Sequence, residues 1–390
     1  MIIPKLAFKN IIGAGLRTWL NVIVLSFAYV AIIWTQGLYV GMNRQASRAI
    51  IDYEIGGGQY WVNGYDPYDV FTFDDAHAEI PDPLDRLIED NQAISILVVR
   101  GTMYPNGRIM SVQLKGIDPL QTTIDLPSNV LQNSEEDIPA LIGSRMARNS
   151  GLNAGDYVTV RWRDVNGTFD AIDVHIVDVM RTTVSTIDIG QIWLPLDRLR
   201  EMASLRDEAT LVVIDKAITA IPSIAGWEFK NHDFLLKDIR DIVQMKTVSA
   251  SIMYLILLFL AMIAIFDTQI LSVFKRRKEI RTLMALGMTR WRVVSLFTFE
   301  GAMHGIIAMV IASIYGIPLL IWFSKQGWAM PQSIDDYGLA IGEKLFPSYS
   351  LTLIIGTILI VLISTTIVSY LPSRRISRIK PTDALKGKSV

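Results

Sequence analysis

Four apolar stretches, each long enough to cross a bilayer, constrain this 390-residue chain more than any other feature. They lie at residues 18–42, 247–274, 296–323 and 350–371. An α-helix rises about 1.5 Å per residue, so roughly 20 apolar residues span the hydrocarbon core. One such stretch would also suit a buried core helix. Four together, in a chain that is 51% hydrophobic and only 19% charged, predict a membrane protein with four transmembrane helices.

Charge is distributed unevenly along the chain. Residues 42–246 contain 19 Lys and Arg against 31 Asp and Glu, whereas the rest contains 18 against 7. Basic residues precede the first stretch, fill 275–295 and follow the fourth stretch, and such flanks mark the cytoplasmic side. We therefore expect an amphipathic segment 1–17, the segment 275–295 and a tail 372–390 in the cytoplasm, with both termini inside. Residues 43–246 and a loop at 324–349 are expected on the outer side.

The acidic region 43–246 alternates short strand and helix signals, which predicts a large α+β domain inserted between the first two membrane helices. Its flanks, 43–53 and 234–246, have helical patterns and are expected to extend those helices as a stalk. Strands are predicted at 94–100, 109–117, 156–163, 170–179, 192–194 and 211–214, and helices at 83–91, 144–150 and 196–203. Asn106-Gly107 and Asn166-Gly167 are expected turns, and Gly56-Gly57-Gly58 a flexible loop.

The sequence predicts no catalytic, cofactor-binding or metal-ligating residue. The chain has no cysteine, and its four histidines, His77, His175, His232 and His304, lack ligand spacing. Gly387-Lys388-Ser389 imitates the end of a phosphate-binding loop but lacks the required upstream glycine. Asp267 lies near one end of the second membrane helix. It admits two interpretations, a proton relay or a carboxylate at the membrane interface, and the second is favoured.

The segment 275–300 carries the most informative pattern. Ile280, Leu283, Met284 and Leu286 form an apolar stripe at helical spacing that ends at Gly287, between basic flanks. Such a helix could lie on anionic lipid or dock into a groove of a cytoplasmic partner. Small residues then follow on the third membrane helix, where they permit close helix packing within the chain or across a dimer: Gly301, Gly305, Ala308 and Ala312.

These residues resemble the FtsX-like permease domain of MacB-type (type VII) ABC transporters. The resemblance rests on R-R-K-E-I-x-x-L-x-A-L-G-M-T, on Glu300 at the start of the third membrane helix, and on the tail Y-L-P-S-R-R-I-S-R-I-K-P-T-D-A-L-K-G. The stretches 116–119 and 142–160 are similar to the LolC and LolE lipoprotein-releasing permeases, although related permeases of other substrates share them. Unlike MacB itself, this chain contains no ATPase motif.

The resemblance implies a coupling helix that contacts a separate ATPase present in two copies, with ATP and Mg held by that partner and none by this chain. The implied coupling residues are Arg277, Glu279, Ile280, Leu283, Ala285, Leu286 and Gly287. The implied tail motif consists of Pro372, Arg374, Arg375, Pro381, Ala384 and Leu385. It further implies a second permease subunit, identical or related, and a bacterial inner-membrane location.

The implied activity is mechanotransmission, in which ATP-driven closure on the cytoplasmic side reshapes the outer domains. Lipoprotein extraction from the membrane is the favoured role. Alternatives are a permease for toxin, peptide or small-molecule export through a periplasmic adaptor, an FtsX-like regulator of a cell-wall hydrolase, and a membrane-anchored sensor. No nucleic acid is expected as a partner.

Overall fold

The computed structural model describes residues 16–132, 137–182, 184–218, 221–329 and 344–374. The chain forms two compact units. A helical unit contains the chain up to Met42, Val243–Trp328 and the part from Leu345 onward, and an α+β domain is built from Asn43–Ile242. Each unit has its own apolar core.

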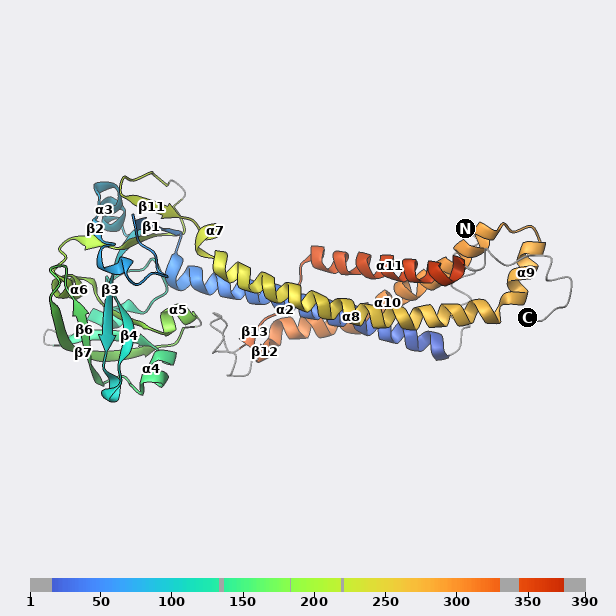
Figure 1. The fold of residues 1–390 in the computed structure, drawn as a ribbon, viewed down its shortest axis with the longest axis horizontal. Helices are drawn as coiled ribbons and strands as arrows, with labels where there is room; N and C mark the ends of the chain where they lie inside the picture. The colour runs from blue at the N-terminus through green and yellow to red at the C-terminus, as the bar shows by residue number, and fades with distance from the viewer. Residues whose placement is uncertain (1–15, 133–136, 183, 219–220, 330–343, 375–390) are drawn as a thin grey trace. The chain divides into compact units, whose positions relative to one another are not determined.

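The helical unit is built from the helices that Figure 1 labels α2 (Leu16–Ile50), α8 (Lys237–Lys275), α9 (Arg277–Ala285), α10 (Arg290–Gln326) and α11 (Leu351–Arg374). The four long helices share one apolar core, to which each contributes. That core includes Leu25 and Tyr29 of α2, Met262 of α8, Ala308 of α10 and Val361 of α11. The small residues of α10 and the larger residues of the other helices therefore pack as a bundle.

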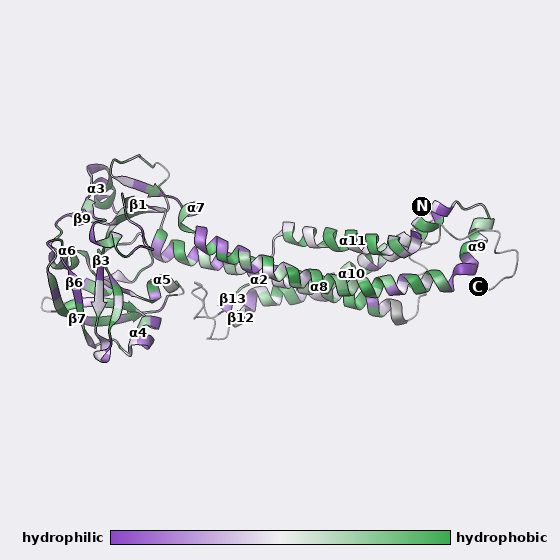
Figure 2. Cartoon of the chain, in the orientation of Figure 1, coloured by the Kyte–Doolittle hydropathy of each residue, from purple (hydrophilic) through white to green (hydrophobic). Residues whose placement is uncertain are grey.

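Most of the apolar surface of these helices faces away from the bundle core. Large side chains such as Phe259, Ile314 and Ile363 are 65%, 71% and 57% exposed, and Figure 2 shows the long helices predominantly in the hydrophobic colour. Within the described residues, four helices are long and apolar enough to cross a membrane: Trp19–Ile55, Lys237–Lys275, Arg290–Gln326 and Leu351–Arg374. Buried core helices would hide these side chains, so the chain is a membrane protein.

The α+β domain is organised around a nine-stranded mixed sheet in the order β11-β1-β10-β3-β4-β8-β5-β7-β6. Its strands are β1 (Gly58–Val62), β3 (Ala93–Met103), β4 (Met110–Ile117), β5 (Ile138–Gly143), β6 (Tyr157–Arg163), β7 (Phe169–Met180), β8 (Gln191–Pro195), β10 (Leu211–Ile214) and β11 (Trp227–Lys230). The end of β3 also pairs with β6, from Gly101↔Trp162 to Met103↔Val160. This second pairing closes six strands into a barrel, from which β10, β1 and β11 extend.

Helices close the barrel and cover the extension. The barrel interior is filled by inward residues such as Leu97, Leu114 and Ile176, together with Met146 of α4 (Ser144–Ser150) and Leu199 of α6 (Leu196–Ala203). A separate cluster joins α3 (Asp82–Glu89) to β1, β10 and β11. Short elements complete the described residues: η1 (Ile51–Ile55), η2 (Thr72–Asp74), η3 (Pro105–Gly107), η4 (Ser128–Gln132), α5 (Ser185–Asp188), α7 (His232–Leu235), and the strand pairs β2 (Ala78–Glu79) with β9 (Glu208–Ala209) and β12 (Trp328–Ala329) with β13 (Lys344–Leu345).

All six predicted strands and all three predicted helices of the α+β domain are present, with small shifts at their ends. Asn106-Gly107 and Asn166-Gly167 are turns, as expected, and Asn106, Gly107 and Gly167 have positive φ. The prediction of a flexible loop at Gly56-Gly57-Gly58 was wrong. A Cβ on Gly57 would lie 2.3 Å from the Asp215 carbonyl oxygen, and Gly58 begins β1. These glycines permit close backbone packing where the chain enters the sheet.

Candidate coupling surface

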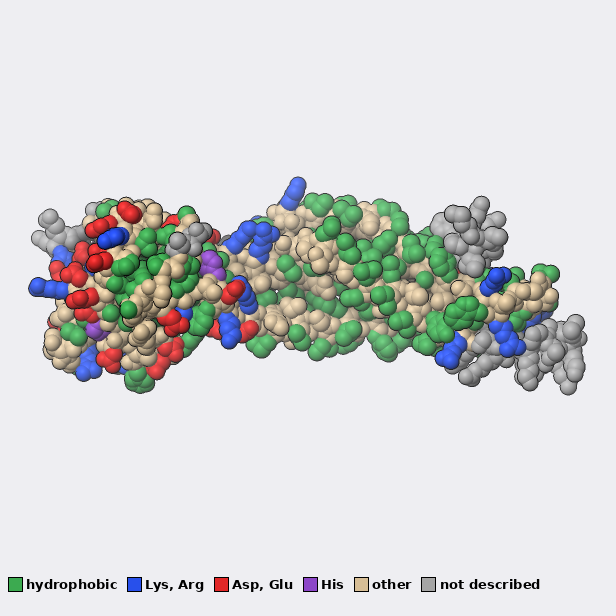
Figure 3. Space-filling model, turned by 90° about the horizontal axis from the view of Figure 1, so that it is seen from above, with side chains coloured by type: hydrophobic (Ala, Val, Ile, Leu, Met, Phe, Trp, Pro, Cys, Tyr) green, Lys and Arg blue, Asp and Glu red, His purple; other side chains and the backbone are tan. Residues whose placement is uncertain are grey.

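The short helix α9 connects α8 to α10 at one end of the helical unit, where Figure 3 shows a group of Lys and Arg side chains at the right of the view. It ends at Ala285, two residues before Gly287, whose φ of +94° favours glycine and whose N–H donates to the Met284 carbonyl. The next helix begins at an N-cap, because the Thr289 hydroxyl accepts from the Arg292 N–H. A glycine stop followed by a threonine cap explains why the chain turns here rather than continuing as one helix.

The inner face of α9 belongs to the core of the helical unit itself. Ile280 is fully buried, in a cluster with Val273 of α8 and Val293 and Phe297 of α10, and Met284 packs against the same cluster. The predicted stripe is therefore split between two faces. Ile280, which the resemblance assigned to coupling, lies inside the bundle and is not available to a partner.

The surface around the turn from α9 to α10 carries exposed apolar side chains between basic ones. Leu286 is 80% exposed and Trp291 is 68% exposed, although the Trp291 ring also makes an edge contact with Tyr370. Leu283 is half-buried, whereas Glu279, Ala285 and Gly287 are exposed. The basic residues Lys278, Arg290 and Arg292 are exposed around them. Exposed large apolar residues beside charged ones are typical of a surface that another protein covers.

Arg276, immediately before α9, links the surrounding helices through two carboxylates. Its Nη1 donates to both oxygens of Glu300 at 3.0 and 2.8 Å, and its Nε and Nη2 donate to Glu279 at 2.6 and 2.7 Å. The guanidinium also lies 4.9 Å from the centre of the Phe297 ring. The Glu300 side chain is only 8% exposed. Planar guanidinium geometry suits such multiple contacts, so Arg276 holds the start of α9 against α10.

These contacts shift ionisation in the direction expected for an ion pair. Hydrogen bonds to Glu279, together with the charges of Glu300 and Glu279, raise the pKa of Arg276 against the opposing effect of its burial. The hydrogen bonds from Arg276 lower the pKa of Glu279 below its ordinary value. Both groups are therefore held in their charged forms at neutral pH.

The small residues of α10 provide the close approach to α11. A Cβ on Gly301 would lie 2.1 Å from Ser369 Oγ, and one on Gly305 would lie 2.9 Å from Thr365 Oγ1. Ala308 and Ala312 continue the row into the bundle core. Of the two arrangements left open by the sequence, packing within the chain is the one that these contacts describe.

The remaining candidate residues lie on other helices or outside the described residues. Pro372 and Arg374 lie in the last turn of α11, Pro372 buried and Arg374 exposed. Asp267 on α8 is exposed. The amphipathic segment before Leu16 and the other tail-motif residues are outside the described part of the chain: Arg375, Pro381, Ala384 and Leu385.

Three structural features were missed by reasoning from sequence. Glu300 was named only as part of the resemblance, and its burial and its pairing with Arg276 were not predicted, although the rule that singled out Asp267 applies to it equally. Arg276 was hidden within a basic run that reads as membrane flank. Gly37 and Gly41 of α2 form a small-xxx-small pair, and added Cβ atoms there would lie 2.2 Å from the Tyr349 ring and 2.1 Å from the Phe346 carbonyl oxygen.

Comparison with known proteins locates a family in this part of the chain. A family model described as "FtsX-like permease C-terminal" matches residues 251–381. A search of curated protein sequences gave no match. Among solved structures, the extracellular domain of the noncanonic ABC-type transporter YknZ from Gram-positive bacteria is similar, with 13% identity and a TM-score of 0.26, over 42% of this chain and 84% of that one.

The family match covers every element that builds the candidate coupling surface. It includes most of α8, all of α9 and α10, and α11 with its final proline. It also contains both Arg276 and Glu300, which hold α9 in place. Residues 251–381 of this chain therefore match the C-terminal domain of FtsX-like permeases.

Proposed function

We propose that this chain is the membrane subunit of an ABC transporter whose ATPase is a separate protein that docks on α9. Leu286 and Trp291 form the centre of the docking surface, and Lys278, Arg290 and Arg292 form its basic rim. ATP and Mg are bound by the partner, and this chain hydrolyses no ATP on its own. The proposal rests above all on the exposure of Leu286, which is 80% exposed immediately after a helix that is otherwise anchored to its own bundle.

Anchoring is what makes α9 suitable for coupling. A docking element transmits displacement only if it moves together with the helices behind it. The buried Ile280 and the Arg276–Glu300 pair supply that attachment to α8 and α10. An exposed helix without these contacts would bend under a partner's movement without shifting the bundle.

We further propose that the movement reaches the α+β domain, and that the work done there is lipoprotein release from the inner membrane. In this scheme α9 and both termini are cytoplasmic, the α+β domain is periplasmic, and two permease subunits work with two ATPases. The basic flanks of the spans and the acidic α+β domain support this orientation. Export through an adaptor remains the alternative function.

The docking proposal is tested by Leu286→Asp, with Ile109→Asp as the matched control. Both residues are highly exposed, at 80% and 74%, so neither substitution disturbs a core. In the proposed complex the new carboxylate at position 286 would be buried unpaired, at a cost on the order of several kcal/mol. Leu283→Asp is a weaker test, because Leu283 is already half-buried in the chain alone.

Each tagged variant is expressed in its native cell, purified in mild detergent, and assayed for the co-purified ATPase and for ATP hydrolysis. We expect the wild type and Ile109→Asp to retain the ATPase and Leu286→Asp to lose it. A Leu286→Asp complex with a full ATPase complement and normal hydrolysis would show that α9 does not dock. ATP hydrolysis by the isolated wild-type chain would contradict the assignment of the ATPase to a partner.

A further inference from the structure

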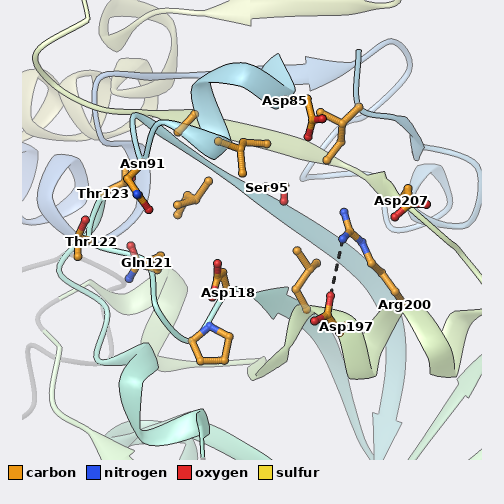
Figure 4. A pocket seen from close by; sticks show the side chains of 16 residues that line it. Asp85, Asn91, Ser95, Asp118, Gln121, Thr122, Thr123, Asp197, Arg200 and Asp207 are labelled. Atoms are coloured by element: carbon orange, nitrogen blue, oxygen red, sulfur yellow. Dashed lines mark ion pairs between the residues drawn. The ribbon is translucent and has the colours of Figure 1, made fainter. Parts of the chain in front are cut away.

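A polar cavity of about 350 Å³ lies within the α+β domain. It is bounded by α3, the first residues of β3, the segment after β4 and the first turns of α6. Its volume falls in the range of small-molecule sites, roughly 300–1,000 Å³. Figure 4 shows the side chains that line it.

The charged lining of the cavity is predominantly acidic. Asp85, Asp118, Asp197 and Asp207 contribute carboxylates, and Arg200 is the single basic residue among the lining residues. Arg200 is already engaged, because its Nε donates to the Glu208 carbonyl at 3.1 Å and its Nη1 lies 3.9 Å from Asp197. The cavity therefore favours a cation over an anion.

Two of these carboxylates are available to a ligand. No side-chain hydrogen bond or ion pair joins Asp85 or Asp207 to any residue within the described ranges. In the view of Figure 4 they lie on one side of the cavity, and Asp118 and Gln121 lie on the other. The negative charge thus surrounds the space rather than gathering at one point.

Two buried hydroxyl groups in the wall of the cavity also lack partners. Ser95 and Thr123 are only 5% and 7% exposed, and both line the cavity. Neither hydroxyl hydrogen-bonds to any described residue. Figure 4 shows the Ser95 oxygen between the two acidic sides. Both oxygens remain accessible from the cavity, so each can accept a hydrogen bond from a ligand bound there.

The separation of the acidic groups selects among cations. Among the described residues, no three His, Asp or Glu side chains are placed to hold a metal ion. A metal requires converging ligands, whereas an ammonium group can donate N–H bonds to separate carboxylates such as Asp85 and Asp207. The apolar lining residues Ile88, Pro119 and Leu196 provide surface for a carbon stem.

We infer that this cavity binds an organic ligand that carries an ammonium group, with Asp85 and Asp207 as charge partners and Ser95 and Thr123 as hydrogen-bond acceptors. The ligand is either a free aliphatic amine or a lysine side chain on a peptide. The inference does not depend on the proposed ATPase coupling, because every residue of the site lies in the α+β domain.

The test is calorimetric titration of the full chain in nanodiscs of phosphatidylcholine, whose zero net charge avoids amine binding to lipid. Putrescine tests the free amine, N-acetyl-lysine methylamide tests the peptide side chain, and 1,4-butanediol is the uncharged analogue of putrescine. We expect at least one amine to bind and butanediol not to bind. The tighter of the two amines identifies the source of the ligand.

Variants locate the binding. Asp85→Asn and Asp207→Asn remove charge at positions without partners in the described fold, and each is expected to weaken amine binding about tenfold. Ser95→Ala is expected to weaken it by a smaller factor. Asp241→Asn, an exposed acid on α8 outside the cavity, is the matched control and should bind as the wild type does. Failure of both amines to bind at millimolar concentration, equal binding of butanediol, or unchanged affinity in Asp85→Asn and Asp207→Asn would each overturn the inference.

Discussion

Removing the Arg276 side chain tests how α9 is held, because it leaves a carboxylate without its cation in a nearly closed site. The Glu300 side chain is 8% exposed and receives two contacts from Arg276. Breaking a buried ion pair in this way costs about 3–5 kcal/mol, because the remaining charge is uncompensated. Glu279 is 48% exposed, so its loss should cost no more than about 1 kcal/mol.

Hydrogen–deuterium exchange of the full chain in nanodiscs reads this difference at the level of single helices. In Arg276→Ala, the amides of α9 should lose protection by roughly two to four orders of magnitude, since each 1.36 kcal/mol is about a factor of ten. In Glu279→Ala the same amides should change less than about tenfold. Arg276→Lys should fall between them, because one ammonium cannot serve both carboxylates with a planar fork.

A double variant separates buried charge from lost packing. Arg276→Ala combined with Glu300→Gln removes both charges, and α9 should recover much of its protection. If the double variant exchanges as fast as Arg276→Ala alone, the cation–π and packing contacts of Arg276 hold α9, and the charge argument is wrong. If Arg276→Ala exchanges no faster than Glu279→Ala, Arg276 does not anchor the helix at all.

Two other consequences can be measured on the same protein. Gly301→Ala should destabilise the α10–α11 contact by about 1–3 kcal/mol in detergent-melting experiments, because the new Cβ would lie 2.1 Å from Ser369 Oγ. Gly356→Ala on α11 is the control. Nothing lies within 4 Å of its Cβ, so this substitution should be neutral or stabilising. Arg276 lowers the pKa of Glu279 in the folded state. The contribution of this ion pair to the stability of α9 is therefore fully present above the pKa that Glu279 has in the unfolded chain, and it is lost as the pH falls through the lower pKa of the folded state. Protection of α9, corrected for intrinsic exchange, should therefore be constant from neutral pH to about the ordinary glutamate value of 4.5 and decline only below it; a decline between pH 7 and 5 would contradict the assignment.

The features predicted correctly from sequence are those that depend on the residue pattern within a single helix or strand. Burial alternates along β6, where Val158, Val160 and Trp162 face the barrel interior. This period of two is visible in the sequence itself. The three strands of the large sheet that were missed have short or interrupted patterns: β1 begins at the last of three glycines, β5 contains Pro139, and β11 has only four residues. Their status as strands depends on partners supplied by distant parts of the chain.

The candidate coupling surface also has a part that could be predicted from sequence and a part that could not. Helical spacing predicted that α9 has apolar faces, but spacing alone does not say which of them another part of the chain covers. Phe297 and Val293 of α10 decide that, and they bury Ile280 while leaving Leu286 exposed. The Arg276–Glu300 pair joins residues 24 positions apart across a helix connection. Such a pairing is a property of the packed bundle rather than of a local motif.

The entry and exit of the α+β domain lie beside each other, and this makes the domain a portable module. The first strand β1 and the last strand β11 pair antiparallel, from Gln59↔Lys230 to Val62↔Trp227, and His232 Nε2 lies 2.9 Å from the Gly56 carbonyl oxygen. A domain whose two ends lie side by side can be inserted, exchanged or removed at one point in a gene without changing the order of the strands in its sheet. A short linker joining positions 42 and 243 would therefore delete the domain at a single junction and leave the four hydrophobic helices to insert in their original order.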